Sequence, residues 1–315
     1  MATDNALFYK HSGKFSPTAP VAMVVAGGGL GLLTGALYGV MVAYSPIIYL
    51  NLVATVGTGF AVGWGVLKMA RAQRVRNPAL VAGCGVLAGL VAWYGSWVTW
   101  LWAMGGWSMD WLVLRPDYLY YISQELAIDG VWSIGSSGTA VSGLALKGVW
   151  VVEALIMLVI GGGYPAREIA RTPYSETERA WADYHEVLPP LALIPKTERK
   201  GFKQRLKNGD FTVLAELGPV AEDELSWTQY QLISTQPEGG GESHFLTIRT
   251  VENAVNKKGE VTTTNQVVAR NVIIDAESRD LIKQIVEADR PAPDTASALV
   301  ETADTTDAAD PVEPN

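Results

Sequence analysis

The stretch Gly130–Arg171, GVWSIGSSGTAVSGLALKGVWVVEALIMLVIGGGYPAREIAR, decides how the rest of the chain is organised. It opens rich in Gly and Ser, is apolar from Val149 to Gly163, and ends in arginines. We interpret the apolar part as a membrane-spanning helix, although it is short and contains Glu153. An acid at the centre of a span costs about 2.5–3.5 kcal/mol, and the neighbouring aliphatic residues offset much of that cost. A start at Val141 would also place Lys147 in the span, where its side chain can snorkel outward.

Three more uncharged runs precede this one in a chain of 315 residues that is 49% hydrophobic. About 20 apolar residues cross a hydrocarbon core of ~30 Å, and Val21–Tyr44, Ile47–Leu67 and Ala79–Met104 are each long enough. We therefore predict an α-helical membrane bundle of four transmembrane helices within residues 21–164. The far end of the third run is rich in tryptophan, which favours the membrane–water interface: Trp93, Trp97, Trp100, Trp102, Trp107 and Trp111.

The short basic segments assign a direction to the spans. Cytoplasmic loops carry an excess of Lys and Arg, and the strongly basic segments all fall on one side of a four-span bundle. We therefore expect both termini in the cytoplasm, with residues 1–20 as a cytoplasmic N-terminal segment and residues 105–148 outside. The cations on the cytoplasmic side are Lys10, Lys14, Lys68, Arg71, Arg74, Arg76, Arg167, Arg171 and Arg179, and those of the external segment are Arg115 and Lys147.

The external segment 105–148 is predicted to contain one short helix along the outer surface. Pro116 and Asp117 suit a helix start, because proline fits the first turn and an acid suits the positive end of the helix dipole. Asp129-Gly130 ends the helical pattern. The Gly- and Ser-rich residues 130–146 are then either an external loop or a re-entrant segment, whose backbone would need protein or water around it.

Beyond Tyr164 the chain predicts a small cytosolic α+β domain, residues 165–289. Ser175–Glu178 has capping-box spacing, so we expect a helix from there to about Val187, ended by Pro189-Pro190. Period-two alternation then predicts strands at Phe211–Leu217, Trp227–Thr235, Phe245–Val255 and Glu260–Asp275, with a turn at residues 256–259 between the last two.

A closing helix, Ala276–Ala288, is expected after the strands, with Asp275 as its N-cap. Residues 290–315 are rich in Pro, Ala, Thr and Asp and have little apolar surface to bury. We therefore expect a disordered acidic tail.

Small residues repeat along three of the predicted spans. Glycines four residues apart share one face of a helix and let two helix backbones approach closely. The spacing indicates tight packing within one four-helix bundle or, alternatively, the interface of a homo-oligomer. The glycines concerned are Gly27, Gly31, Gly35, Gly39, Gly59, Gly63, Gly85 and Gly89.

Glu153 is the candidate intramembrane polar site. Acids inside a span are rare and are functional candidates whose partner should be named. The predicted partners are Lys147, Asn51, and the hydroxyl groups of Ser45 or Thr55. Two readings remain open, a structural polar contact and a role in transport or proton handling.

A basic run in the soluble half is a candidate for contact with membrane lipid. Clusters of four to eight cations on the cytoplasmic side attract anionic lipid headgroups, and a plain solvated face is the alternative. Nucleic acid is not expected as a partner, because the net charge is −8 and the domain beyond the run is acidic. The residues are Lys196, Arg199, Lys200, Lys203, Arg205 and Lys207.

No motif in the sequence points to catalysis, a metal or a cofactor. His11, His185 and His244 are scattered, and Cys84 is the only cysteine, which excludes an intrachain disulfide. No Ser/His/Asp arrangement or pair of acids indicates an active site. The sequence therefore leans away from an enzyme.

Several short motifs stand together in this chain: Gly130-Val-Trp-Ser-Ile-Gly135, Val141-Ser-Gly143, Trp150 with Glu153-Ala154, and a start with Tyr9, His11-Ser-Gly-Lys14 and Ser16-Pro17. In this combination the membrane half resembles a group of uncharacterised bacterial four-span membrane proteins. The resemblance implies a shared architecture in the bacterial inner membrane and no activity. Some members carry a cysteine pair after the last span, where this chain has YPAREIAR, so no metal site carries over.

Three functional hypotheses follow, in order of preference. The first is an integral membrane protein whose bundle anchors a cytosolic interaction or scaffold domain for an unidentified protein partner. The second is a small-solute or proton transporter that uses Glu153. The third is a membrane-bound enzyme.

Overall fold

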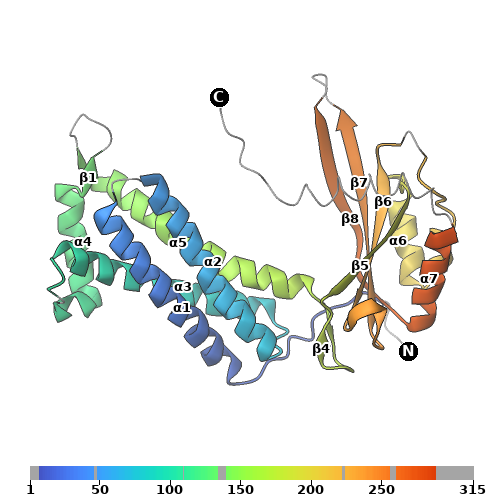
Figure 1. The fold of residues 1–315 in the computed structure, drawn as a ribbon, viewed down its shortest axis with the longest axis horizontal. Helices are drawn as coiled ribbons and strands as arrows, with labels where there is room; N and C mark the ends of the chain where they lie inside the picture. Colours follow the sequence, from blue (N-terminus) through green and yellow to red (C-terminus); the bar gives the residue numbers. More distant parts are fainter. Residues whose placement is uncertain are drawn as a thin grey trace. The chain divides into compact units, whose positions relative to one another are not determined.

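The computed structural model describes residues 7–45, 48–108, 110–133, 140–221, 224–255 and 260–288. The chain forms two compact units: a helical unit, His11–Arg171, and a sheet-containing unit that combines Met1–Lys10 with Thr172–Asn315 (Figure 1). The predicted turn at residues 256–259 and the predicted tail at 290–315 lie outside the described residues.

Four helices of the helical unit are long and apolar enough to cross a membrane, in agreement with the predicted four-span architecture. Helix α5 is longer than the apolar run that predicted it and continues through the polar turn after Pro165. Hydropathy marks where apolar residues stop, whereas the helical backbone goes on to Arg171. The four helices are α1 (Ala19–Tyr44), α2 (Ile48–Ala72), α3 (Pro78–Met104) and α5 (Gly143–Arg171).

A small cap of structure connects α3 to α5. The 3₁₀ helix η1 (Trp111–Leu114) is followed by α4 (Pro116–Asp129), which is the predicted external helix. Leu119 of α4 packs against Val98 of α3 and Val113 of η1. The short strands β1 (Trp132–Ser133) and β2 (Ala140–Val141) then pair antiparallel. Residues 134–139 between them lie outside the described residues, so the choice between loop and re-entrant segment stays open.

The sheet-containing unit is built on a four-stranded antiparallel sheet of order β5-β6-β7-β8 (Figure 1). Helices α6 (Arg199–Lys207) and α7 (Ala276–Ala288) pack against the sheet and bury one core with it. The strands are β5 (Tyr184–Ala192), β6 (Trp227–Ser234), β7 (His244–Val255) and β8 (Val261–Ile274). The core includes Phe202, Leu206, Tyr230, Leu232, Leu246, Ile248, Ile282 and Val286.

A segment from the start of the chain pairs with the outer edge of this sheet. The Tyr9 N–H donates to the Asn271 carbonyl at 3.0 Å, and the Ile273 N–H donates to the Leu7 carbonyl at 2.7 Å. Phe8 is therefore paired antiparallel with Val272 on the outer edge of β8. The Tyr9 hydroxyl also accepts a hydrogen bond from the Tyr174 N–H at 3.0 Å. Leu7–Tyr9, expected only as part of an N-terminal segment, thus belongs to the sheet-containing unit.

The predicted helix from Ser175 to Val187 is wrong. Strands β3 (Tyr174–Ser175) and β4 (Ala180–Trp181) occupy its first half and β5 its second. Ser175 Oγ does accept the Glu178 N–H at 3.0 Å, as a capping box would require, but the bond closes a hairpin turn instead of a helix. Pro189-Pro190 lies inside β5, where a register shift and an edge position tolerate residues without an N–H.

The predicted strand Phe211–Leu217 is also wrong, because the segment begins with a 3₁₀ helix, η3 (Phe211–Leu214). Phe211, Val213 and Leu214 are all buried, so the burial does not alternate as a strand requires. The other three predicted strands are confirmed as β6, β7 and β8. Helix α7 is confirmed too, and its cap forms as expected, with Asp275 Oδ1 accepting the Ser278 N–H at 2.8 Å.

Candidate functional site

One acid lies among the apolar side chains of the helical unit. Glu153 of α5 is partly buried and forms a side-chain hydrogen bond with Tyr38 of α1. Tyr38 also forms a side-chain hydrogen bond with Thr55 of α2. Tyr38 is only 6% exposed and Thr55 is fully buried. We call these three residues, contributed by three helices, the Glu153 network.

Close helix packing sets the level at which the network forms. A Cβ at Gly59 of α2 would lie 3.0 Å from Ile160 and 3.4 Å from Met157, both on α5. Thr55 precedes Gly59 by four residues, and Glu153 precedes Met157 by four. Since α2 and α5 run in the same direction, one helical turn along each brings Thr55 and Glu153 to the same level.

Two other polar atoms close to this level are buried and have no hydrogen-bond partner among the described residues: Asn51 Oδ1 of α2 and Trp93 Nε1 of α3. Asn51 lies one turn before Thr55, and its carbonyl accepts the Thr55 hydroxyl at 2.8 Å. An unpaired buried polar atom costs about 1–3 kcal/mol. Such atoms in a polar layer are typical partners of a bound water molecule or small polar ligand.

The position of Trp93 relative to Glu153 follows from an aromatic contact one helical turn away, between Trp97 and Trp150. The rings of Trp97 on α3 and Trp150 on α5 lie 4.9 Å apart in an edge arrangement. Because α3 and α5 are antiparallel, a step of one turn from this pair leads to Trp93 on one helix and Glu153 on the other. All four spanning helices therefore contribute a polar group near this level.

The predicted partners of Glu153 are only partly brought together. Thr55 belongs to the network through Tyr38. Lys147 instead donates to Gln124 Oε1 of α4 at 2.5 Å. Tyr38 was not predicted as a partner of Glu153. The feature that could have indicated it is a hydroxyl group in an otherwise apolar span, near the end of α1 that leads to α2.

All eight predicted packing glycines lie at helix–helix contacts inside the helical unit. A Cβ at Gly35 would stand 2.5 Å from the Ala92 carbonyl oxygen, and one at Gly85 would stand 2.2 Å from the Gly161 carbonyl oxygen. These contacts are with backbone, which cannot give way. The helix faces that carry these glycines are therefore used for packing within one chain. The other six, Gly27, Gly31, Gly39, Gly59, Gly63 and Gly89, face neighbouring helices at 2.4–3.1 Å.

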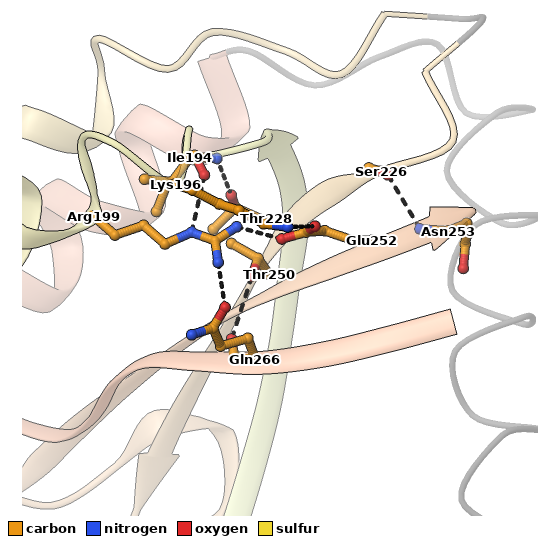
Figure 2. Close-up of polar contacts among 9 residues, drawn as sticks. All are labelled: Ile194, Lys196, Arg199, Ser226, Thr228, Thr250, Glu252, Asn253 and Gln266. Carbon is orange, nitrogen blue, oxygen red and sulfur yellow. Dashed lines mark hydrogen bonds and ion pairs between the residues drawn. The ribbon is translucent and has the colours of Figure 1, made fainter. Parts of the chain in front are cut away.

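The predicted lipid-contact residues divide into two groups. The first group binds carboxylates of its own domain: Arg205 pairs with Asp210 at 2.7 Å and with Glu216 at 2.6 Å. Lys196 and Arg199 both pair with Glu252, at 2.9 and 2.5 Å (Figure 2). These internal partners reduce the charge that the first group can offer to lipid.

The second group, Lys200, Lys203 and Lys207, follows one face of α6 at helical spacing. The Lys203 and Lys207 ammonium groups lie 5.6 and 5.9 Å from the centre of the Phe8 ring. Cation–π contacts of this kind are weak where they are exposed. This Lys200/Lys203/Lys207 face is the part of the basic run that best fits contact with anionic lipid.

A second polar cluster lies in the sheet-containing unit and was not predicted. Glu178 Oε1 accepts the backbone N–H groups of Glu242 at 2.7 Å and Ser243 at 2.8 Å, and Oε2 accepts the Thr235 hydroxyl. Desolvation raises the pKa of Glu178, but these hydrogen bonds together outweigh it and lower the pKa. At Gly241 φ is +94°, and a Cβ there would stand 2.5 Å from Thr235 Oγ1. The cluster connects the loop that contains Gly241 to the turn between β3 and β4.

The described part of the chain contains no group of three or more His, Cys, Asp and Glu side chains that could hold a metal ion. Burial lowers the pKa of His185 on β5 and the pKa of His244 on β7, and the nearby Arg279 lowers the pKa of His244 further.

Cys84 is buried in α3, with its sulfur 3.8 Å from the Pro20 carbonyl oxygen. The contact fits a small packing residue of the bundle.

Comparison with known proteins finds no matching family model, no matching curated protein and no matching solved structure. The class of protein therefore rests on the structure itself, which has four helices long and apolar enough to cross a membrane, followed by an α+β unit.

Proposed function

We propose that this chain anchors an interaction or scaffold domain at the cytoplasmic face of a bacterial inner membrane. The observation that carries the proposal is the pairing of Leu7–Tyr9 with β8. Because of this pairing, the domain contains residues that precede the four spans in the sequence as well as residues that follow them. The segment that precedes α1 covers the edge of β8 around Val272.

The same pairing supports an even number of membrane crossings. Tyr9 and Tyr174 are hydrogen-bonded within one folded unit, so both lie on the same side of the membrane. Four spanning helices between them satisfy this condition. The excess of cations on that side favours the cytoplasm.

Two chain connections support the anchoring role. The chain passes between the two units at Lys10–His11 and again at Arg171–Thr172. A domain tethered twice to a membrane stays at its surface, which raises its effective concentration toward any partner held there. The Lys200/Lys203/Lys207 face supports an additional contact with anionic lipid, at about 1 kcal/mol per cation close to the surface.

Photo-crosslinking in intact cells tests this proposal. A photoreactive amino acid is placed at Leu225 or Val187, both exposed on the domain, and at Leu33, which is exposed on the bundle. We expect the same protein partner to be captured from both domain positions and only lipid from Leu33. A reporter after residue 288 that works only outside the cell would contradict the proposal, as would capture of protein partners through Leu33 alone.

Small-solute or proton transport is a second candidate, and the Glu153 network favours it. The two buried polar atoms of Asn51 and Trp93 near that network could be satisfied by a transported species. Purified protein in liposomes is assayed for proton and solute flux, with Glu153→Gln and Tyr38→Phe as variants. Transport predicts a flux that Glu153→Gln abolishes without loss of expression, and absence of flux in the wild type removes this candidate.

A further inference from the structure

The β7–β8 ribbon extends past the rest of its sheet. Pairing of β6 with β7 ends at Trp227↔Val251, whereas pairing of β7 with β8 continues to Val255↔Val261. Figure 1 shows the two strands projecting beyond β6. Because a two-stranded ribbon alone is marginally stable in water, this end of the sheet needs support of its own.

An ion-pair network supplies that support on one face of the ribbon (Figure 2). The Arg199 side chain is 12% exposed. Its guanidinium group donates to Glu252 of β7, to the side chain of Gln266 of β8 and, at 3.2 Å, to the Ile194 carbonyl. Arg199 therefore ties both strands of the ribbon to the segment that leads into α6.

The β7 edge of the ribbon is covered as well. The Asn253 N–H donates to Ser226 Oγ at 3.1 Å, a bond drawn in Figure 2, and Asn253 Nδ2 donates to the Leu225 carbonyl at 2.9 Å. One face and one edge of the ribbon are thus held in place by the domain itself.

The other edge, formed by β8, is open over the same length. Leu7–Tyr9 occupies this edge only around Val272. Along Val261–Val267, β8 pairs with β7 on one side, and no strand of the described chain pairs with it on the other side. Every residue of this stretch is exposed. Soluble proteins usually protect such an edge with charge, proline or a bulge, but the sequence VTTTNQV contains no charge and no proline.

We propose that this edge pairs antiparallel with the same edge of a second copy of the chain, so that two sheets become one. The sequence VTTTNQV is self-complementary about its centre, Thr264. A two-fold axis at Thr264 places Val261 opposite Val267 of the other copy, and uncharged Thr, Asn and Gln opposite one another. Val261 and Val267 are 61% and 42% exposed, and the pairing covers each of them with the other valine of the second copy.

Alternation supports this choice of partner. Val261 and Val267 are an even number of residues apart, so both lie on the same face of β8. Gln266 points to the opposite face, where it binds Arg199. The dimer therefore forms without breaking the network that holds the ribbon. Cross-strand pairs of β-branched and Thr side chains each contribute favourably, and no like charges meet.

This inference deepens the proposed function, because it adds a second copy of the chain as one partner of the interaction domain. Copies anchored in one membrane meet at a raised effective concentration, so a short strand interface is sufficient for association there.

Disulfide crosslinking of the full chain in isolated membranes tests the pairing. Directly opposed residues of antiparallel strands lie about 4.5–5.5 Å apart, which a disulfide can bridge. In a Cys84→Ala background, Thr264→Cys is expected to give a crosslinked dimer under mild oxidation. The matched control is Ala254→Cys, which is exposed on the other strand of the same ribbon. Equal dimer from the two variants overturns the proposal.

A second pair of variants tests the register. Membranes that contain Val261→Cys and Val267→Cys chains together are expected to form the mixed dimer, and either chain alone much less. Adding Thr264→Lys to these chains sets two cations opposite each other and is expected to lower the mixed dimer by up to about fivefold. An unchanged yield, with the fold intact by circular dichroism, contradicts the pairing. Partner capture from Leu225 and Val187 is read separately, so failure here is distinguishable from failure of the anchoring function.

Discussion

The two units of this chain are held together by opposite kinds of core. Helix contacts in the helical unit are made by glycine and alanine, as where Gly35 meets Ala92. The sheet-containing unit buries large side chains, such as Tyr230, Leu246 and Ile282. In a membrane, apolar side chains gain little by leaving lipid, so close backbone packing holds helices together. In water, burial of apolar area is the main stabilising term.

The outer faces of the two units differ in the same way. Leu33 of α1 is 60% exposed, and exposed Leu or Val side chains occur on all four long helices. The described faces of the sheet-containing unit expose mainly polar residues. Large apolar side chains are thus buried in the sheet-containing unit and exposed on the helical unit. The two units should therefore respond differently to the same substitution.

The largest expected effect is loss of a large side chain from the sheet-containing unit. Leu246 is fully buried, and Leu246→Ala should lower the free energy of unfolding by about 2–5 kcal/mol through lost burial and a cavity. Leu33→Ala is the matched control, because its side chain is exposed on the helical unit. Thermal unfolding of the full chain and hydrogen exchange of the sheet measure both. Comparable losses in the two variants would remove the distinction between the cores.

The next largest effect is gain of one carbon at a glycine contact. A Cβ at Gly85 would stand 2.2 Å from the Gly161 carbonyl oxygen and 2.7 Å from Gly162 Cα. Gly85→Ala should therefore push α3 and α5 apart and destabilise the bundle by about 1–3 kcal/mol or more. Gly83→Ala, in the same helix with nothing within 4 Å, should be neutral or slightly stabilising, since alanine favours helix. Resistance of the bundle to heat in detergent separates the two, and equal behaviour would contradict glycine packing.

A smaller, pH-dependent effect is expected at Glu178. Its lowered pKa means that the folded state favours the ionised carboxylate, so this stabilisation is present above the ordinary pKa of glutamate and is lost as the pH falls through the lowered pKa. Glu178→Gln should lower stability by about 1 kcal/mol near pH 7, discounted for partial exposure. The difference from the wild type should vanish in acid. A difference that is independent of pH would show that the carboxylate charge has no role in holding the loop.

The smallest effect is expected at the basic face of α6. In nanodiscs with anionic lipid, Lys200, Lys203 and Lys207 should react with an amine-labelling reagent more slowly than in neutral nanodiscs, because each cation gains about 1 kcal/mol near an anionic surface. Lys283, which is paired with Glu186 at 2.8 Å, is the internal control. Equal labelling rates in both lipids would show that the basic face of α6 is solvated and does not contact lipid.

Local patterns in the sequence predicted the features that depend on residues close together in the chain. Glycine spacing identified the helix contacts, although it did not find Gly161, which faces Gly85. Period-two alternation found β6, β7 and β8, and Asp275 was recognised as the cap of α7. The capping-box bond between Ser175 and Glu178 also formed, but the surrounding sheet recruited that turn into a hairpin.

What the sequence could not predict depends on residues far apart in the chain. Phe8 pairs with Val272 across almost the whole sequence, and nothing in the three residues Leu7–Tyr9 names that partner. The link from Tyr38 to Glu153 also required the packing of the four helices. Both follow from tertiary structure, which local propensity does not encode.

The pairing of Leu7–Tyr9 with β8 is the central claim, and a disulfide tests it most directly. The bonds from Tyr9 to Asn271 and from Ile273 to Leu7 flank Phe8 and Val272, which makes them a non-hydrogen-bonded pair with Cα atoms about 4.5 Å apart. In a Cys84→Ala background, Phe8→Cys with Val272→Cys should form an intrachain disulfide in isolated membranes, as should the paired positions Ala254 and Thr262 of the β7–β8 ribbon. A disulfide at the ribbon but none between residues 8 and 272 would contradict the account.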